Sequence, residues 1–365
     1  MLSMFDQIQM GGLVLSNRIV MAPLTRNRAV AGLKPGELTA EYYRQRASAG
    51  LIIAEATQIS PMGQGYLDTP GIYSEEQVAA WKTVTDAVHG AGGHIFLQLW
   101  HVGRISHISL LPDGAAPVSS TNRRPNAQTF SAEGFVDVSQ PRALRDDEIP
   151  GLIADYRHAA RCAIDAGFDG IEVHSANNYL LEQFLRDSVN DREGSYGGSI
   201  ANRTRLVVEV MRAVSEEIGA GRIGIRLSPM TTFSDTPRDS DPQALYNHLV
   251  EQLEPMGLAY LHVIEGETGG ARAPADAIVP FDYDALHKRF SGCWMVNNGY
   301  GREDAEQVIA NGKADLVAFG RPFISNPDLV RRLREGAPLN RLQEDKFYGG
   351  GAEGYTDYPA LDVAE

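Results

Sequence analysis

The sequence has few cysteines, no long apolar run and no excess of positive charge. Its 365 residues include two cysteines, Cys162 and Cys293, which are too few for a disulfide framework and which we expect to be small core residues in a reducing compartment. The formal net charge of −14 disfavours binding to nucleic acid or to an anionic membrane surface. No run approaches the roughly 20 apolar residues of a membrane-spanning helix. Since the N-terminus also lacks a basic start, we expect a cytoplasmic protein with no membrane and no nucleic-acid partner.

The sequence also lacks a dinucleotide fingerprint, because no G-x-G-x-x-G follows a strand pattern and the glycine-rich stretch 348–355 precedes no strand and helix. What it contains is eight short apolar runs, most of them separated by helical patterns, which is typical of parallel strands covered on both faces. The expected strands are 18–23, 51–56, 94–100, 170–174, 223–228, 260–264, 294–299 and 315–320. Eight such units predict an α/β fold, a single (β/α)8 TIM barrel domain over residues 1–365.

Helix-start patterns support this order. Ser74 and Gln77 form a capping-box pattern, and Asp241 and Asn326 each precede a proline, as an N-cap does. Helical spacing continues over 147–166 and over 302–311, where Gly312 is the expected end. Segment 101–145 is rich in Pro, Ser, Asn and Gly. We expect it to be a long loop or small capping subdomain after the third strand, on the C-terminal face where barrel enzymes hold their active sites.

Polar residues gather where the expected strands end, accompanied there by one tryptophan and one glycine. These positions are Thr25, Gln98, Trp100, His174, Arg226, Asn297, Asn298, Gly320 and Arg321. Barrels often bind phosphate at the loops after the seventh and eighth strands. There Gly299 and Gly320 would let the backbone approach a phosphate, which Arg321 would grip with two hydrogen bonds. His101 and His107 have no other ligands around them, so no metal site is expected.

The fourth expected strand carries two ionisable residues of the same parity. Glu172 and His174 point the same way, so Glu172 lies below His174 inside the barrel if the imidazole faces the mouth. A buried carboxylate needs a partner, and Arg226 on the neighbouring strand is the partner we expect. Just after this strand come an amide and a phenol, Asn177 and Tyr179.

Six stretches of the chain, in order and together spanning most of its length, resemble the Old Yellow Enzyme family of flavin-dependent ene-reductases, its bacterial members in particular. They are MAPLTRNRA (21–29), YYRQRASAGLIIAEAT (42–57), QLWHVGRISH (98–107), HSANNYLLEQFL (174–185), AFGRPFISNPDL (318–329) and FYGGGAEGYTDYP (347–359). The resemblance implies a barrel that binds FMN at the C-terminal ends of its strands.

The resemblance also implies how the chain holds FMN. Thr25 would lie near the C4 carbonyl of the flavin, Gln98 at its pyrimidine edge, and Arg226 near N1 and O2, where negative charge gathers on reduction. Gly299 and Arg321 would hold the phosphate. The cofactor contacts implied in full are Pro23, Leu24, Thr25, Ala56, Gln98, His174, Arg226, Asn298, Gly299, Gly320 and Arg321.

The resemblance implies that His174 and Asn177 bind the oxygen of an activated alkene above the flavin. Residues three apart on a helical turn face the same way, so the two could converge on one atom. Tyr179 would donate the proton after hydride transfer from flavin N5, with NADPH or NADH reducing the flavin. Trp100, Tyr66 and Tyr348 would line the substrate pocket. The implied substrates are α,β-unsaturated carbonyl compounds and nitroalkenes, with nitrate esters as a further class.

Two other functions stay open at this point. One is a flavin-binding protein without turnover, and the other is a barrel lyase or isomerase that acts on a phosphorylated substrate. The longer 2,4-dienoyl-CoA reductase type carries an iron–sulfur cluster, for which two cysteines are too few. Asn178 departs from the family pattern, because glycine is common there, although asparagine tolerates left-handed backbone better than most residues. We expect a monomer or a small homo-oligomer.

Overall fold

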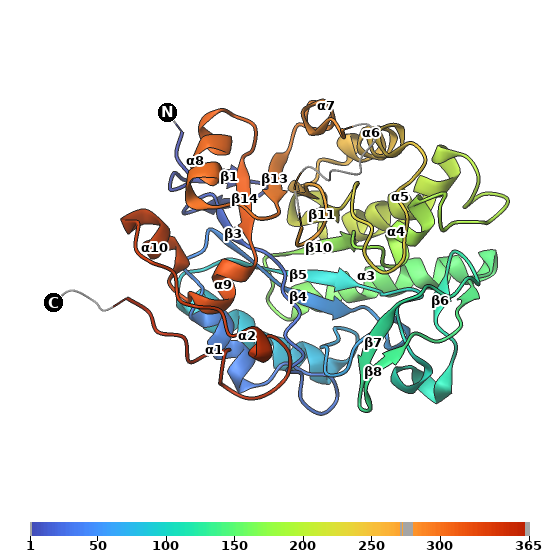
Figure 1. Ribbon diagram of the computed structural model, residues 1–365, viewed down its shortest axis with the longest axis horizontal. Helices are drawn as coiled ribbons and strands as arrows, with labels where there is room; N and C mark the ends of the chain where they lie inside the picture. Colours follow the sequence, from blue (N-terminus) through green and yellow to red (C-terminus); the bar gives the residue numbers. More distant parts are fainter. Residues whose placement is uncertain (1, 271, 273–279, 362–365) are drawn as a thin grey trace.

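Eight parallel strands form a closed barrel, as expected from the sequence (Figure 1). The computed structural model describes residues 2–270, 272 and 280–361. Around the barrel the order is β10-β11-β12-β13-β14-β3-β4-β5. The strands are β3 (Ile19–Met21), β4 (Leu51–Gln58), β5 (Ile95–Trp100), β10 (Gly170–Ser175), β11 (Ile223–Leu227), β12 (Tyr260–Ile264), β13 (Cys293–Asn297) and β14 (Leu316–Phe319). Each overlaps a run that the sequence marks as a strand, with ends that differ by up to two residues, so the barrel prediction is confirmed.

Helices surround the barrel, and two of them begin at the caps that the sequence predicts. They are α1 (Glu37–Arg44), α2 (Glu75–Gly90), α3 (Ile149–Asp165), α4 (Leu180–Leu185), α5 (Ile200–Ile218), α6 (Pro242–Leu253), α7 (Tyr283–His287), α8 (Arg302–Ala310), α9 (Arg321–Ser325) and α10 (Leu329–Glu335). Short 3-10 turns occur at η1 (Pro61–Gly63), η2 (Ile108–Leu110), η3 (Pro112–Gly114), η4 (Asp146–Glu148), η5 (Ala220–Arg222), η6 (Glu254–Met256) and η7 (Glu344–Lys346). Ser74 forms the predicted capping box with Gln77, and Asp241 caps α6.

One predicted helix start is wrong. Asn326 does not cap a helix beginning at Pro327, because α10 begins at Leu329 with Asp328 as its N-cap residue. Asn326 instead follows the last residue of α9, where its side-chain amide donates to the carbonyl oxygen of Pro322 over 2.8 Å. The proline that follows favours an extended backbone at Asn326, so it ends one helix rather than starting the next.

Residues 101–145 form an insertion between β5 and α3. Its strands are β6 (Val118–Ser119), β7 (Gln128–Ser131), β8 (Gly134–Asp137) and β9 (Arg142–Ala143). β7 and β8 make an antiparallel hairpin, and β6 pairs with β9 in parallel. The Leu67 amide in the loop after β4 donates to the Phe130 carbonyl, and the Ser120 hydroxyl donates to the Gln183 carbonyl in α4. The insertion therefore packs on segments that follow the C-terminal ends of two barrel strands.

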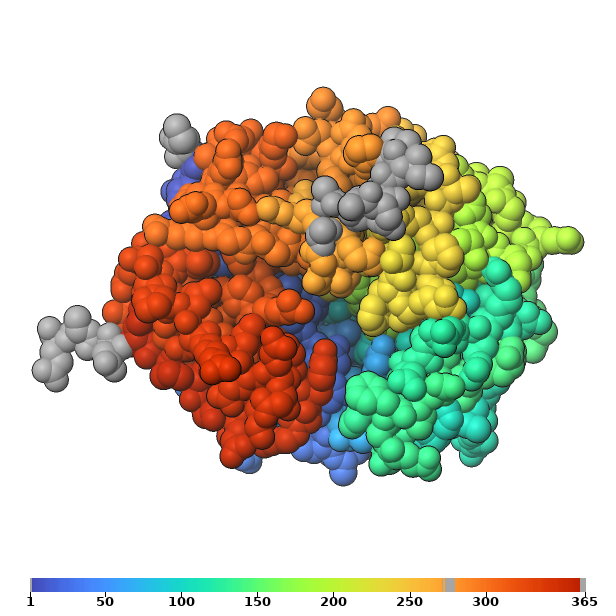
Figure 2. Space-filling view, viewed as in Figure 1, coloured from blue at the N-terminus to red at the C-terminus, as the bar shows by residue number. Residues whose placement is uncertain are grey.

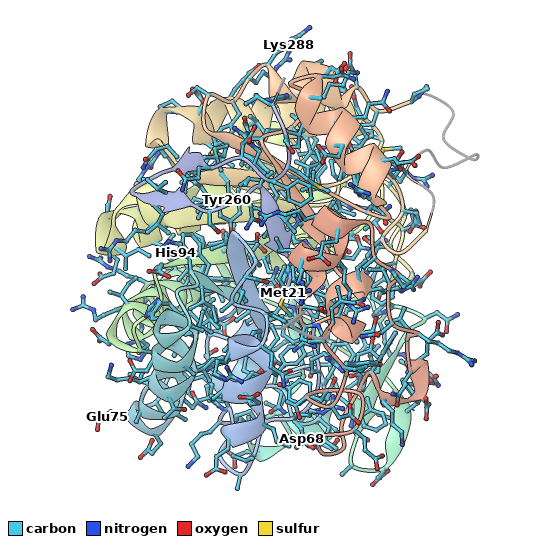
Figure 3. All side chains as sticks on the ribbon, turned by 90° about the vertical axis from the view of Figure 1, so that its left-hand side faces the viewer. Met21, Asp68, Glu75, His94, Tyr260 and Lys288 are labelled. Atoms are coloured by element: carbon cyan, nitrogen blue, oxygen red, sulfur yellow. The ribbon has the colours of Figure 1, made fainter. Side chains whose placement is uncertain are left out.

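The apolar core has two main parts, one inside the barrel and one between the strands and the helices. Tyr260 of the first part and Met21 of the second are labelled in Figure 3. A hairpin of β1 (Ile8–Met10) and β2 (Leu13–Leu15) packs Met10 and Leu15 against the inner cluster. Inside the barrel the Tyr260 ring lies where a side chain at Gly224 would be, since a Cβ there would come within 2.1 Å of the ring. Cys162 is buried as expected, whereas Cys293 is only half-buried. None of the described helices is long and apolar enough to cross a membrane.

Candidate active site

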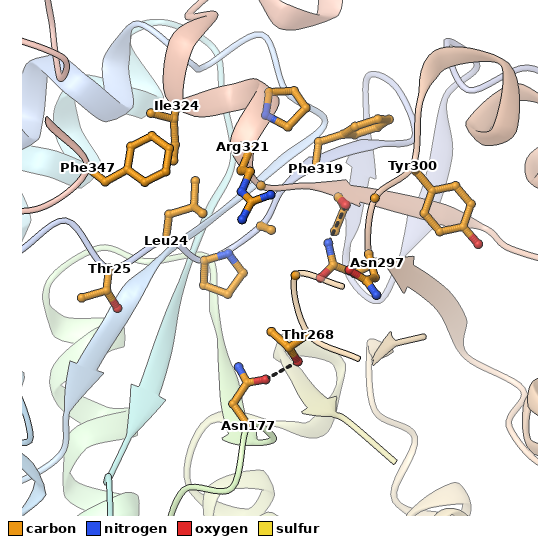
Figure 4. A pocket seen from close by; sticks show the side chains of 18 of the residues that line it. Leu24, Thr25, Asn177, Thr268, Asn297, Tyr300, Phe319, Arg321, Ile324 and Phe347 are labelled. Carbon is orange, nitrogen blue, oxygen red and sulfur yellow. Dashed lines mark hydrogen bonds between the residues drawn. The ribbon is translucent and has the colours of Figure 1, made fainter. Parts of the chain in front are cut away.

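A cavity of about 600 Å³ opens at the C-terminal ends of β3, β11, β13 and β14. Figure 2 shows the hollow between the red C-terminal segment and the green and yellow segments opposite. Many residues predicted from the sequence line it: Pro23, Leu24, Thr25, Asn177, Arg226, Asn298, Gly299, Gly320, Arg321 and Tyr348. In Figure 4 Leu24 and Arg321 lie on one side of the pocket, and Asn177 lies with Thr268 on another. The volume is that of a typical cofactor or substrate site.

Arg226 supplies a buried cation to this cavity. One guanidinium nitrogen donates to Asn297 Oδ1 over 2.9 Å, and the Asn297 amide donates in turn to the Ala318 carbonyl over 2.7 Å. Among the described residues, the Arg226 Nε is buried without a hydrogen-bond partner. Burial lowers the pKa of Arg226, but arginine stays charged in proteins. An unpaired buried donor is costly, so the site fits a ligand with acceptor atoms or negative charge, such as the N1 and O2 edge of a flavin.

Below this cation lies a buried carboxylate, and its partners differ from the expected one. Glu172 accepts a hydrogen bond from Gln98 Nε2 and another from His262 Nδ1, each over 2.8 Å. Arg226 does not pair with Glu172 directly, because the strand register sets Glu172 level with Gly224 and Arg226 level with His174. The prediction of an Arg226 partner is therefore wrong, although the charge of Glu172 still raises the pKa of Arg226.

The Glu172 contact fixes the orientation of Gln98. The Gln98 side chain is buried, and its Nε2 donates to Glu172, so its Oε1 is left to accept. An acceptor at this place suits the N3–H of a flavin pyrimidine ring. Burial lowers the pKa of His262, so a neutral imidazole donates its Nδ1–H to the carboxylate. The Glu172 charge is thus held beneath the cofactor site by two neutral donors.

With the FMN that the family resemblance implies bound in this cavity, replacing Glu172 by glutamine is expected to raise the midpoint potential of the cofactor. The carboxylate repels negative charge that builds up on the flavin during reduction, and the substitution removes that repulsion. At an effective dielectric constant of about 20 the effect is on the order of 30 mV, or about 1.4 kcal/mol for two electrons. The potential is measured by equilibration with a reference dye. The control is Glu209→Gln, which removes an equal charge from α5, a helix outside the barrel. Equal midpoint potentials in the two variants would contradict the claim that the Glu172 charge acts on the flavin.

The loops after β13 and β14 build the end of the cavity where the sequence predicts a phosphate. Gly299 has a φ of 67°, a left-handed conformation that favours glycine, and a Cβ placed there would meet nothing within 4 Å. Gly320 directly precedes Arg321, the first residue of α9 and a cation that lines the cavity. Asn298 also lines the cavity, but its side-chain amide donates to the carbonyls of Glu265 and Glu267 over 2.6 and 2.8 Å. The side-chain N–H groups of Asn298 are therefore occupied, which leaves its Oδ1 and its backbone for a contact with a cofactor.

Beside the cavity an aromatic cluster surrounds His174. The Trp100 ring stacks on Tyr66 with centroids 5.7 Å apart and on His174 at 6.4 Å. The Tyr179 ring meets Trp100 and His174 edge to face, at 5.0 and 5.1 Å. Ala56 belongs to the same apolar cluster. The sequence-predicted substrate residues Trp100 and Tyr66 thus lie together, while Tyr348 borders the cavity with 64% of its surface exposed.

The protonation of His174 follows from its surroundings. Burial, and then the charge of Arg226, hold the pKa of His174 well below its ordinary value. The ring is therefore neutral at pH 7, and its Nδ1 accepts a hydrogen bond from the Ala176 amide over 3.3 Å. A neutral imidazole that accepts at Nδ1 carries its proton on Nε2. His174 can thus donate one Nε2–H to a ligand without adding a positive charge.

The turn after β10 does not have the expected helical form. Asn177 and Asn178 have φ values of 55° and 63°, which is left-handed backbone. A glutamate and a serine hold this turn: the Asn178 amide donates to Glu182 over 2.6 Å, and the Asn177 amide donates to Ser228 Oγ over 2.8 Å. Helical spacing therefore does not bring His174 and Asn177 together, and Asn178 has the left-handed backbone that asparagine tolerates better than most residues.

Tyr179 directly precedes α4 and is 9% exposed. Its hydroxyl lies 3.1 Å from the Tyr66 hydroxyl. Burial, with Tyr66 as a second cause, holds the pKa of Tyr179 well above its ordinary value. Burial also raises the pKa of Tyr66 to about 12. Both phenols therefore keep their protons at neutral pH, which is what a proton donor requires.

Several site residues carried no signal in the sequence. Thr268 lines the cavity and contacts Asn177, although 91 positions separate them. Ser228 and Glu182 hold the turn after β10. Each is a single polar residue in a loop, turn or helix, and only the fold brings it to the site. Among the described residues there is also no group of three His, Cys, Asp or Glu side chains placed to hold a metal ion.

Comparisons with known proteins give a consistent result. The model of the NADH:flavin oxidoreductase / NADH oxidase family matches residues 3–340. 12-oxophytodienoate reductase 1 of Oryza sativa subsp. japonica is 51% identical over 360 residues, which cover 97% of this chain and 92% of the rice protein. Morphinone reductase in complex with tetrahydroNAD has a TM-score of 0.93 and 46% identity, covering 99% and 98% of the two chains. The old yellow enzyme homologue from Zymomonas mobilis has a TM-score of 0.92 and 42% identity, covering 99% and 100%.

Proposed function

Because the chain belongs to the NADH:flavin oxidoreductase / NADH oxidase family, the Old Yellow Enzyme family that its motifs resemble, it is an FMN-dependent oxidoreductase, and we propose how its own residues act. We propose that it reduces the activated C=C bond of α,β-unsaturated carbonyl compounds and nitroalkenes, with NADPH or NADH as the electron source. The relatives named above as reductases of 12-oxophytodienoate and morphinone support this substrate class.

The observation that carries the proposal is a pair of N–H donors beside the cofactor site that no hydrogen bond among the described residues uses. His174 keeps one Nε2–H because its Nδ1 is occupied, and the Asn177 amide keeps its N–H groups because its oxygen is occupied. Both donors are neutral at pH 7. A carbonyl or nitro oxygen that gains negative charge during reduction is the ligand that such a pair favours. A phosphorylated substrate would instead favour cations at this place.

The chemistry that bound FMN supplies is two-electron transfer from the reduced nicotinamide to the alkene. Arg226, Gln98 and Thr25 would hold the ring, while Gly299 and Arg321 would hold the phosphate. His174 and Asn177 would polarise the substrate oxygen. Tyr179, protonated at neutral pH, would then give its hydroxyl proton to Cα of the substrate.

The surroundings of the site suit a flat, largely apolar substrate. Trp100 and Tyr66 stack beside His174, and Tyr348 borders the opening. Segment 101–145 would cap this opening, because its hairpin contacts the loop after β4. Reducing conditions suit the two free cysteines, so we place the protein in the cytoplasm. We further propose that it is a monomer or a small homo-oligomer.

A substrate panel tests the proposed function. The purified protein is assayed for NADPH oxidation with 2-cyclohexenone, a nitroalkene, a nitrate ester and a saturated ketone as the control. We expect turnover with the enone and the nitroalkene and none with the saturated ketone. A flavin protein without turnover would oxidise NADPH equally with and without the alkenes, and that result would contradict the proposal.

The pH dependence of alkene reduction should be flat over the neutral range. His174 acts as a neutral donor, and its pKa lies below the ordinary value of about 6.5, so activity is lost only in acid below that pH. Tyr179 acts as a protonated donor, and its pKa lies above about 10, so activity is lost only in stronger alkali. The rate of reoxidation of pre-reduced enzyme by the enone, measured from about pH 6.5 to 9, is expected to stay within about twofold. A titration near pH 7 would argue against both assignments.

A further inference from the structure

A threonine outside the sequence motifs contacts the proposed oxygen-binding amide. Thr268 lies in the loop after β12, and its Oγ1 donates to Asn177 Oδ1 over 2.7 Å (Figure 4). Both residues line the cavity. Asn177 follows β10 and Thr268 follows β12, 91 positions later, so the contact depends on the fold.

The contact determines which end of the Asn177 amide is available to a ligand. An asparagine side chain has one acceptor oxygen and one donor NH2 group, and the torsion that exchanges them has only a shallow preference. The Thr268 hydroxyl occupies the oxygen, and no hydrogen bond within the described parts of the chain uses Asn177 Nδ2. We infer that Thr268 is a positioning residue that keeps the Asn177 N–H groups directed at the substrate oxygen. This inference rests on the proposed function.

Thr268 is itself held in place from both sides. Its backbone amide donates to Thr231 Oγ1 over 3.0 Å, from the loop after β11. The Asn298 amide, after β13, donates to the carbonyls of Glu265 and Glu267 in the same loop. Two neighbouring segments thus fix the backbone that carries the Thr268 hydroxyl, as accurate placement of a supporting contact requires.

The backbone of Asn177 is fixed independently of Thr268. Its amide donates to Ser228 Oγ, and that hydroxyl donates to the buried Glu182 carboxylate over 3.0 Å. Glu182 is also paired with Arg186 over 2.8 Å, and both side chains are fully buried. The backbone at 177 therefore has little freedom, and the amide torsion is what remains to be set. Without Thr268 the amide could rotate and present its oxygen to the substrate oxygen, which is repulsive.

Replacing Thr268 by valine tests the inference, since valine keeps the shape and removes the hydroxyl. We expect kcat/KM for 2-cyclohexenone to fall about tenfold, the usual effect of one neutral hydrogen bond. Thr268→Ser keeps the hydroxyl and should stay within about threefold of the wild type. Thr232→Val is the matched control, because its hydroxyl contacts Glu267 in the same loop and not Asn177. Equal kcat/KM in Thr268→Val and the wild type overturns the inference.

A double-mutant cycle separates positioning from a general effect on the fold. In the Asn177→Ala background Thr268→Val should cost nothing further, because the amide it orients is gone. A full tenfold loss in that background overturns the inference. Binding of 2-cyclohexenone to the oxidised holoprotein, followed by flavin absorbance, does not depend on turnover. An unchanged Kd in Thr268→Val therefore overturns the inference. If the wild type binds the enone more tightly than Thr268→Val does but does not reduce it, the inference is supported and only the proposed function is contradicted.

Discussion

Replacing His174 by alanine is expected to lower kcat/KM for enone reduction by about 10²–10³-fold, which is the usual cost of losing one donor to a developing oxyanion. The imidazole is neutral, and no other residue in the part of the chain that the structure describes accepts its Nε2–H, so its removal takes away stabilisation of negative charge on the substrate oxygen. The measurement is reoxidation of dithionite-reduced enzyme by 2-cyclohexenone in a rapid-mixing experiment, which isolates the alkene half of the reaction.

The control for this substitution is His107→Ala, a histidine of the insertion whose hydrogen bonds go to Ser109. It should leave the reoxidation rate within about twofold, like a surface substitution away from the site. FMN content is measured in both variants, so that a loss of cofactor is not taken for a loss of catalysis. A holoenzyme of His174→Ala that is reoxidised at the wild-type rate would contradict the role of the imidazole.

Replacing Tyr179 by phenylalanine is expected to slow the same reoxidation by about 10²-fold, the lower end of what general acid catalysis contributes. The change keeps the ring, so the edge-to-face contacts with Trp100 and His174 persist while the proton is lost. Reduction of the flavin by NADPH needs no proton from this phenol and should be unaffected. The two half-reactions are measured separately on the same preparation.

Tyr66→Phe separates proton donation from the hydrogen bond between the two phenols. It removes the hydroxyl that lies 3.1 Å from Tyr179 but leaves the Tyr179 proton in place. We expect a loss of less than about tenfold, since only one neutral hydrogen bond is removed. If Tyr66→Phe slowed reoxidation as strongly as Tyr179→Phe, the assignment of proton donation to Tyr179 alone would be wrong.

The sequence predicts the barrel well because the barrel strands are buried on both faces along almost their whole length. Runs such as 51–56 and 223–228 are mainly apolar with few polar residues, since they have no exposed face, and some of the helices between the strands start at recognisable caps. Parity along β10 correctly placed Glu172 in the interior with His174 above it. The six motifs then indicate a family, and membership of that family is confirmed by a match of its model over residues 3–340.

The sequence predicts two features less well: the side-chain contacts between strands, and the backbone conformations of turns. The sequence predicts Arg226, on the adjacent strand, as the partner of Glu172. The register between β10 and β11 is not visible in the sequence, however, and the hydrogen bond to Glu172 comes from His262 on β12. The left-handed turn at Asn177 and Asn178 was open to prediction only from the tolerance of asparagine for that conformation. Thr268 had no pattern around it, because its partner is distant in the chain.

The most direct test of the account is an anaerobic single turnover of the FMN-loaded wild-type protein. One equivalent of NADPH bleaches the flavin, and 2-cyclohexenone is then added. We predict that the flavin absorbance returns and that one equivalent of cyclohexanone forms for each flavin reoxidised. A flavin that stays bleached, or one that is reoxidised without formation of the saturated ketone, would contradict the claim that this site polarises and reduces an activated alkene.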